Sequence, residues 1–197
     1  DAGLLLWLAA LAAPERLTDL CSSLRVESAL ARLQGGGEGR TMELAWFLAG
    51  LSHAALSQPE QHPDLKGLAM AIFESLKRNQ GRHGIFGHQA AGRSVGGLLR
   101  GRIGSFADQV YPIYALTRFA QAYEVPYALD LARRCADAIC HAQGELGQWW
   151  WHYDVRTGRV VERFPVYAIH QDAMGPMALF ALEDAGGAEY REAIERS

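Results

Sequence analysis

The feature that most constrains this chain is a helical spacing of apolar residues that returns along most of its length. Apolar side chains recur every three to four residues, which is the period of an amphipathic helix and not of a strand. Pro14 and Pro126 stand where first helical turns are expected, and Thr41 is an expected cap. The predicted helices cover 3–12, 14–33, 41–57, 63–79, 105–123, 126–142, 170–184 and a last segment from 188.

These predicted helices form pairs on a long period. Helices that begin near Thr41, Ser105 and His170 recur at intervals of about 64 residues, and each is followed by a more polar partner. One helix pair cannot bury its own apolar face, so repeated pairs favour a solenoid or a closed ring. The sequence therefore predicts an all-α fold, an α/α toroid, as a single domain over 1–197. The loops that precede the first helix of each pair should gather at one end of the ring.

Two segments interrupt the helices. Residues 80–104 contain eight glycines and cannot sustain a regular helix. An irregular segment of this length inside a domain is usually functional or mobile. Residues 146–167 alternate with a strand-like period around Arg156-Thr157-Gly158, which predicts a β-hairpin insertion.

Composition argues against several classes of partner. A net charge of -3 and a pI near 6.2 provide no basic footprint for a nucleic acid. The opening run LLLWLAALAA lacks a basic flank and is too short to span a bilayer, so it predicts a core helix and no membrane association. Three cysteines without a framework spacing, Cys21, Cys135 and Cys140, indicate reduced thiols and a cytoplasmic protein.

Neither a metal nor a cofactor is expected. Cys140, His141 and His152 could be imagined as a zinc site, but Cys135 and Cys140 do not form a known ligand spacing and lie in an apolar helical run. The sequence contains no Walker loop, dinucleotide fingerprint or G-x-S-x-G elbow.

The densest candidate site is the run GQWWWHYD at 147–154. Trp149, Trp150 and Trp151 cannot all face a core if the segment is extended, because alternate side chains point to opposite faces. At least one should line a groove, where an indole ring beside His152 can hold a sugar by stacking and hydrogen bonding. The alternative is that the tryptophans pin the hairpin to the helices.

Two similar polar pairs begin successive repeats. Asp108-Gln109 and Gln171-Asp172 each lie near a predicted helix start, the second pair directly after His170. They would place two carboxylates across one cavity, as acid/base hydrolysis of a glycosidic bond requires. Alternatively, both pairs only hydrogen-bond the glycine loops into shape, and Asp172 acts as a helix cap.

His88, at the end of GIFGH in the glycine-rich segment, and Tyr111, one turn after Asp108, complete the set of candidate substrate-binding residues.

Glycine-rich loops that lead into helices, Trp, His and Asp clusters at loop ends, and repeated helical hairpins together resemble the six-hairpin glycosidase-like superfamily of (α/α) barrels. The resemblance covers roughly 40–185. That superfamily includes unsaturated glucuronyl hydrolases, and related toroids include sugar 2-epimerases and polysaccharide lyases. A complete barrel of that kind has more helices than this sequence predicts, so we expect an incomplete toroid.

The resemblance implies a carbohydrate-active enzyme that acts on an oligosaccharide or a uronic-acid-containing glycan. It implies sugar binding by the three tryptophans and His152, and acid/base hydrolysis by Asp108 and Asp172. In an epimerase-like variant His170 and His152 would exchange the proton, and in a lyase-like variant Tyr111 or Tyr114 would act beside His170. Two other classes stay open: a non-catalytic glycan-binding or scaffold toroid, and a terpenoid-cyclase-like toroid, suggested by Gln148-Trp149 but lacking an Asp-rich motif.

Overall fold

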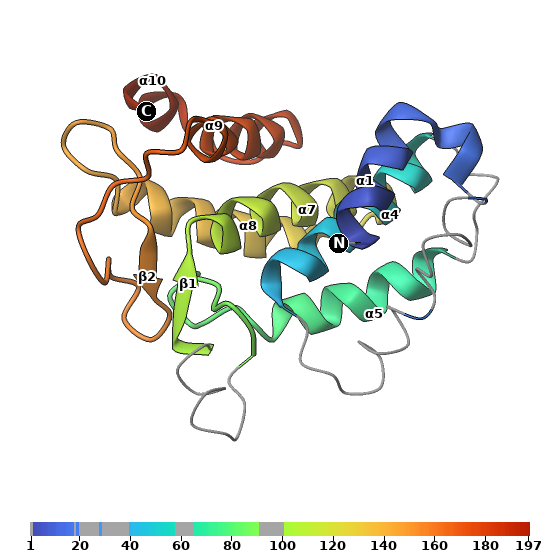
Figure 1. The fold of residues 1–197 in the computed structure, drawn as a ribbon, viewed down its shortest axis with the longest axis horizontal. Helices are drawn as coiled ribbons and strands as arrows, with labels where there is room; N and C mark the ends of the chain where they lie inside the picture. The colour runs from blue at the N-terminus through green and yellow to red at the C-terminus, as the bar shows by residue number, and fades with distance from the viewer. Residues whose placement is uncertain (1, 18, 20–27, 29–39, 58–64, 91–100) are drawn as a thin grey trace.

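The secondary structure is mostly helical, as predicted. The computed structural model describes residues 2–17, 19, 28, 40–57, 65–90 and 101–197, with the backbone alone at 169–171. Strands β1 (Ile103–Ser105) and β2 (His152–Asp154) pair in antiparallel fashion. The helices are α1 (Ala2–Ala12), α4 (Thr41–Ser57), α5 (Leu65–Lys77), α7 (Ala107–Tyr123), α8 (Pro126–His141), α9 (Ile169–Asp184) and α10 (Arg191–Arg196), with a 3₁₀ turn η1 (Pro14–Arg16) after α1 (Figure 1).

The predicted helix over 14–33 lies largely outside the described residues, as does the middle of the glycine-rich segment. Among the helices that are described, none is long and apolar enough to cross a membrane.

Four helices pack in a row in the order α1, α4, α7, α9, while α5 packs on α4 and α8 packs on α7. In Figure 1, α5 runs along one edge of the molecule and α9 with α10 along the opposite edge. The short connection between α7 and α8 turns at Glu124, whose φ of 57° ends α7, so these two helices run antiparallel.

The helices α4, α7 and α9 all begin at one end of the row. The backbone N–H of Thr41, at the start of α4, donates to the carbonyl of His88 (2.9 Å), and the N–H of His88 donates to Ile103 just before α7 (3.0 Å). Phe106, directly before α7, stacks on Trp149, which also abuts Gly175 in the second turn of α9. The loops before these three helices therefore meet at the same end.

A five-residue turn occurs twice, after α5 and after α8, 63 residues apart (80 to 143). The turns are Gln80-Gly81-Arg82-His83-Gly84 and Gln143-Gly144-Glu145-Leu146-Gly147. In each turn the last glycine N–H donates to the carbonyl of the first glycine (3.0 and 2.9 Å), and the last glycine has a positive φ (85° and 84°). The spacing matches the period of about 64 residues that the sequence predicts.

The same contacts join each turn to the second helix of the next pair, α8 for the first turn and α10 for the second. The amide of Gln80 donates to Gly84 and to Leu131 in α8 (both 2.9 Å), and the amide of Gln143 donates to Gly147 (2.8 Å) and to Ala193 in α10 (2.9 Å). An arginine of that next helix donates back to a carbonyl of the turn, from Arg134 to Arg82 (3.0 Å) and from Arg196 to Glu145 (3.2 Å). The structure therefore contains a repeated device that joins one helix pair to the next.

Thr41 performs a different role from the predicted helix cap. Its hydroxyl donates to the carbonyl of Gly87 and accepts from the side-chain amide of Asn79 (2.9 Å), and all of its surface is buried. Thr41 thus clamps the glycine-rich loop onto the start of α4, because the loop crosses the end of the helix at that point.

Alanine at either turn glycine should destabilise the protein strongly. A Cβ at Gly84 would stand 2.2 Å from the carbonyl oxygen of Arg134, and one at Gly147 would stand 1.5 Å from that of Arg196. We expect Gly84→Ala and Gly147→Ala each to lower the free energy of unfolding by roughly 3 kcal/mol or more, measured by urea denaturation.

Gly186 provides the matched control. Its φ is also positive (80°), but a Cβ there would meet no atom within 4 Å. Gly186→Ala should therefore show only the backbone strain, about 1 kcal/mol. Equal losses in all three variants would show that the close approach to the next helix contributes nothing.

Candidate functional site

The predicted site residues that the structure brings together lie where α4 and α7 begin. His88 comes from the glycine-rich loop, Asp108 from the first turn of α7, and His152 from β2. Ser105 connects them, because it precedes α7 and pairs with His152 across the β1–β2 ladder.

The first pair in this site is His88 with Asp108. The carboxylate of Asp108 is fully buried, and its Oδ2 accepts from the N–H (2.9 Å) and the hydroxyl (2.8 Å) of Ser105. His88 Nδ1 lies 3.4 Å from the same Oδ2, and the His88 side chain remains 36% exposed. Oδ1 of Asp108 is also buried and has no hydrogen bond within the described residues. Asp108 therefore lies beneath His88, and the imidazole is the group that meets solvent.

The backbone explains why Asp108 takes this position. Ser105 and Asp108 form a reciprocal cap, because the Asp108 N–H also donates to the Ser105 hydroxyl (3.2 Å). A carboxylate is stabilised in the first turn of a helix by the unpaired amides and the helix dipole. The reciprocal cap between Ser105 and Asp108 is thus part of what places Asp108 beside His88.

The second pair is His152 with Glu162. His152 Nδ1 lies 2.5 Å from Glu162 Oε1, and the two side chains are 43% and 54% exposed. The chain returns to His152 through a turn in which Asp154 Oδ1 accepts from the N–H groups of Arg156 (2.8 Å) and Thr157 (3.0 Å). Glu162 was absent from the sequence-based candidates, although a hairpin centred on Arg156-Thr157 places residues 161 and 162 beside His152.

The two pairs are linked through the small sheet. Ser105 and His152 are direct partners in the antiparallel register, so their side chains project from the same face. Ser105 binds Asp108, which in turn lies under His88. In both pairs Nδ1 faces a carboxylate, which favours the tautomer whose Nε2 accepts a proton. Neither Nε2 has a hydrogen-bond partner in the described part of the chain.

An aromatic face continues from His88 and Asp108 along α7. Tyr111 follows Asp108 by one helical turn and meets the edges of Trp46 from α4 (ring centroids 5.4 Å apart) and Trp7 from α1 (6.2 Å). Trp7 also packs on Tyr114 (5.1 Å). Burial raises the pKa of Tyr111, so its hydroxyl stays neutral. Trp7 and Trp46 are half-buried, so parts of their rings remain accessible.

His53 closes this aromatic face on α4. Its Nε2 lies 2.8 Å from the hydroxyl of Tyr114, and the guanidinium of Arg118 stands over the ring of Tyr114 (5.2 Å). Burial, helped by the positive charge of Arg118, lowers the pKa of His53 to about 4. His53, Trp46 and Trp7 were missing from the sequence-based candidates, because their helical spacing is equally typical of a core.

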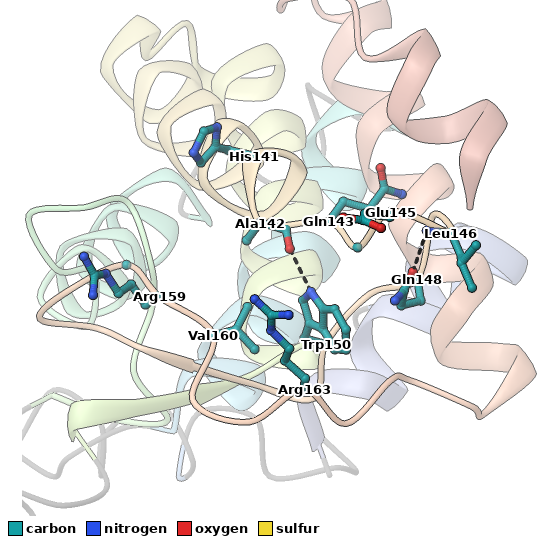
Figure 2. A pocket seen from close by; sticks show the side chains of 12 residues that line it. His141, Ala142, Gln143, Glu145, Leu146, Gln148, Trp150, Arg159, Val160 and Arg163 are labelled. Carbon is teal, nitrogen blue, oxygen red and sulfur yellow. Dashed lines mark hydrogen bonds between the residues drawn. The ribbon is translucent and has the colours of Figure 1, made fainter.

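The three tryptophans separate into three environments. Trp149 is fully buried and stacks on Phe106, so it belongs to the core. Trp150 lines a cavity of about 640 Å³ and donates its indole N–H to the carbonyl of Ala142 (2.7 Å) (Figure 2). Trp151 is half-buried and meets the edge of Tyr167 (5.7 Å). Of the three, Trp150 is the one that lines this cavity, and its role in binding a ligand stays a prediction.

Gln109 holds the glycine-rich loop to α7. It is fully buried, its Oε1 accepts from the N–H of Phe86 (2.8 Å), and its amide donates to the carbonyls of Phe86 (3.0 Å) and Ser105 (2.9 Å). These contacts match the alternative in which the polar pair shapes the loop, because no polar atom of Gln109 remains for a substrate.

Of the second predicted polar pair, Gln171-Asp172, the structure describes only the side chain of Asp172. Asp172 is half-buried in α9, where its N–H donates to Ala168 (3.0 Å) and its side chain makes no cap hydrogen bond. The side chains of His170 and Gln171 lie outside the described residues. Across the described ranges, no group of three or more His, Cys, Asp or Glu side chains is placed to hold a metal ion.

The free energy of unfolding should fall as the pH drops from about 6.5 to about 4. Unfolded His53 gains its proton near 6.5, whereas folded His53 stays neutral down to about 4, so acid favours the unfolded chain in this window. We expect the free energy of unfolding of His53→Gln, whose amide can still hydrogen-bond to Tyr114, to depend less on pH. Between pH 7 and pH 4.5 it should fall by roughly 1–2 kcal/mol less than that of wild type, after allowance for solvent screening, as measured by urea unfolding. His141→Gln, at an exposed position, should behave as wild type does. Identical pH slopes for His53→Gln and wild type would contradict the neutral, buried state of His53.

No protein-family model matches this sequence, and a search of the curated proteins found no significant match. The case for a function therefore rests on the geometry of this chain's own residues.

Proposed function

We propose that the chain is a carbohydrate-active enzyme in which His88 and His152 exchange a proton at a carbon beside the carbonyl of an opened sugar. The observation that carries the proposal is the pair of histidine–carboxylate contacts linked through the β1–β2 ladder. A histidine whose Nδ1 is held by a carboxylate presents Nε2 as a general base, and its protonated form is a general acid. One imidazole would remove the proton and the other would return one. This is the chemistry expected for the epimerase-like variant, with His88 in place of His170.

The aromatic face supports a sugar as the substrate. Tyr111, one helical turn after Asp108, packs against Trp46 and Trp7. Aromatic rings pack against the apolar CH face of a sugar, while imidazole and carboxylate groups bind hydroxyls. A ring held on this face would have its opened end toward the start of α7, where the histidines lie.

The geometry favours histidine chemistry over hydrolysis by two carboxylates. Hydrolysis requires two carboxyl groups that both reach the scissile bond, roughly 5 to 9.5 Å apart. Asp108 is fully buried, and its Oδ2 is already occupied by Ser105. Its position instead suits a carboxylate that orients His88.

The helix arrangement supports an arc of an α/α toroid as the scaffold of this site. The helices α4, α7 and α9 form a row that begins at one end, and α5 and α8 form the second layer. The repeated turn that fastens one helix pair to the next, from Gln80 and from Gln143, supports a regular rotation between pairs.

A non-catalytic glycan-binding scaffold is the second candidate. The buried hydrogen bonds of Gln109 and Thr41 show polar residues that serve only to shape the loop. In that case sugar would bind without any proton exchange.

Deuterium exchange tests the proposal. The chain is incubated in D₂O with reducing hexoses of neutral, N-acetylated and uronic types, and NMR follows deuterium at the carbon beside the carbonyl. We expect wild type to incorporate deuterium into one class, and His88→Asn and His152→Asn each to slow this by about 10²–10⁴-fold. Asp108→Asn should also slow exchange, because it releases the orientation of His88.

Arg156→Gln is the control, since Arg156 is exposed in the turn after β2 and touches neither histidine; its rate should stay within twofold of wild type. Release of reducing ends from oligosaccharides, dependent on Asp108 and Asp172 and without deuterium uptake, would replace the proposal with hydrolysis. Sugar binding without either reaction would establish the scaffold.

A further inference from the structure

Two adjoining hollows form a groove beside the C-terminal half of α8. The first, of about 640 Å³, lies between the 143–148 turn and the 158–163 loop, with Trp150 between them (Figure 2). The second, of about 600 Å³, lies between the 82–83 turn, α8 and the 157–158 turn. His141 and Gly158 line both hollows, so the two hollows are neighbours. Each hollow has the size of a small-molecule site.

The groove concentrates positive charge in a chain whose net charge is -3. Four arginines line it, with only two carboxylates, Asp137 and Glu145; the arginines are Arg82, Arg134, Arg159 and Arg163. None of these four guanidinium groups forms an ion pair with a carboxylate of the described chain. Asp137 already accepts from the hydroxyl of Tyr190 (2.8 Å). The groove is therefore suited to an anionic ligand.

The walls of the groove are fixed in advance. Arg196 donates to the carbonyls of Gly144 (2.9 Å) and Glu145 (3.2 Å), which holds one wall. The opposite wall is held by Asp154, which binds the N–H groups of Arg156 and Thr157. A groove that needs no ordering on binding loses less affinity to entropy.

Trp150 adds a small apolar surface to this charged groove, since its side chain is largely buried and only 8% of it is exposed. Its indole N–H is already used by the carbonyl of Ala142, so only the ring remains for a ligand. Arg163 lies beside the Trp150 ring, Arg159 lies apart from both on the left of the view, and Gln148 comes from the turn on the right (Figure 2). Guanidinium groups pair with carboxylates through two parallel hydrogen bonds, and a ring edge suits the CH face of a sugar.

We infer that this groove binds an oligosaccharide that carries carboxylate groups, with Arg159 and Arg163 on the acid groups and Trp150 against a sugar ring. The choice of a saccharide rests on the proposed function, whereas the anionic character rests on the groove alone. A free phosphate would satisfy the arginines but would leave the Trp150 ring without a ligand surface.

Calorimetric titration with a galacturonic acid tetrasaccharide tests the inference, with maltotetraose as the neutral analogue and inorganic phosphate as the simple anion. We expect wild type to bind the acidic tetrasaccharide at least tenfold more tightly than either comparison ligand. Arg159→Gln combined with Arg163→Gln should weaken that binding at least tenfold. Both side chains are exposed and make no hydrogen bond in the described chain, so the double variant should fold, which circular dichroism verifies.

Arg156→Gln is the matched control, because Arg156 is exposed in the same loop but does not line the groove; its affinity should stay within twofold of wild type. No binding by wild type, equal binding of maltotetraose or phosphate, or an equal loss in Arg156→Gln would each overturn the inference.

The outcome is separable from that of the proposed function. His88 does not line the groove, so His88→Asn should bind the tetrasaccharide within twofold of wild type. Arginine-dependent binding without deuterium exchange would support the groove and reject the histidine chemistry. Histidine-dependent exchange without arginine-dependent binding would support the histidine chemistry and reject the groove.

Discussion

The structure depends on one close contact that occurs twice. In each case a turn glycine approaches a backbone carbonyl of the second helix of the next pair, α8 or α10. Gly84 meets Arg134 in this way, and Gly147 meets Arg196. A side chain at either glycine would push the turn away from that helix, and the hydrogen bond from the turn's glutamine to that helix would be lost with it. Since a helix pair cannot bury its apolar face alone, this contact sets how one pair is placed against the next.

The same turns determine where the residues of the proposed site lie. The chain that leaves the first turn runs directly to His88, and the chain that leaves the second runs to Trp150 and His152. Both segments then cross the starts of parallel helices, where backbone amides favour a carboxylate such as Asp108. The turns also supply groove residues, Arg82 from the first and Glu145 from the second. A single packing device thus positions both the histidine pairs and the groove.

The sequence predicted the elements better than it predicted their contacts. Helical periodicity placed the helix over 41–57 at its observed bounds, because amphipathic spacing is a local property. The pairing of His88 with Asp108 spans 20 residues and depends on the path of the glycine-rich loop, which no local pattern specifies. Gln109 looked like a candidate ligand residue, but its hydrogen-bonding groups are used by Phe86 and Ser105. Which polar residue remains available depends on the backbone groups that happen to lie beside it.

The hairpin shows why site and scaffold cannot be separated in this protein. Along four consecutive residues the chain places Trp149 in the core, Trp150 on the groove, Trp151 against Tyr167, and His152 on Glu162. An extended segment presents alternate side chains to opposite faces, so each of these positions fixes the orientation of its neighbours. The burial of Trp149 against Phe106 therefore sets which way His152 points, although Trp149 itself touches no ligand surface. The sequence run that suggested a binding site therefore connects the core, through Trp149, to the proposed site residues Trp150 and His152.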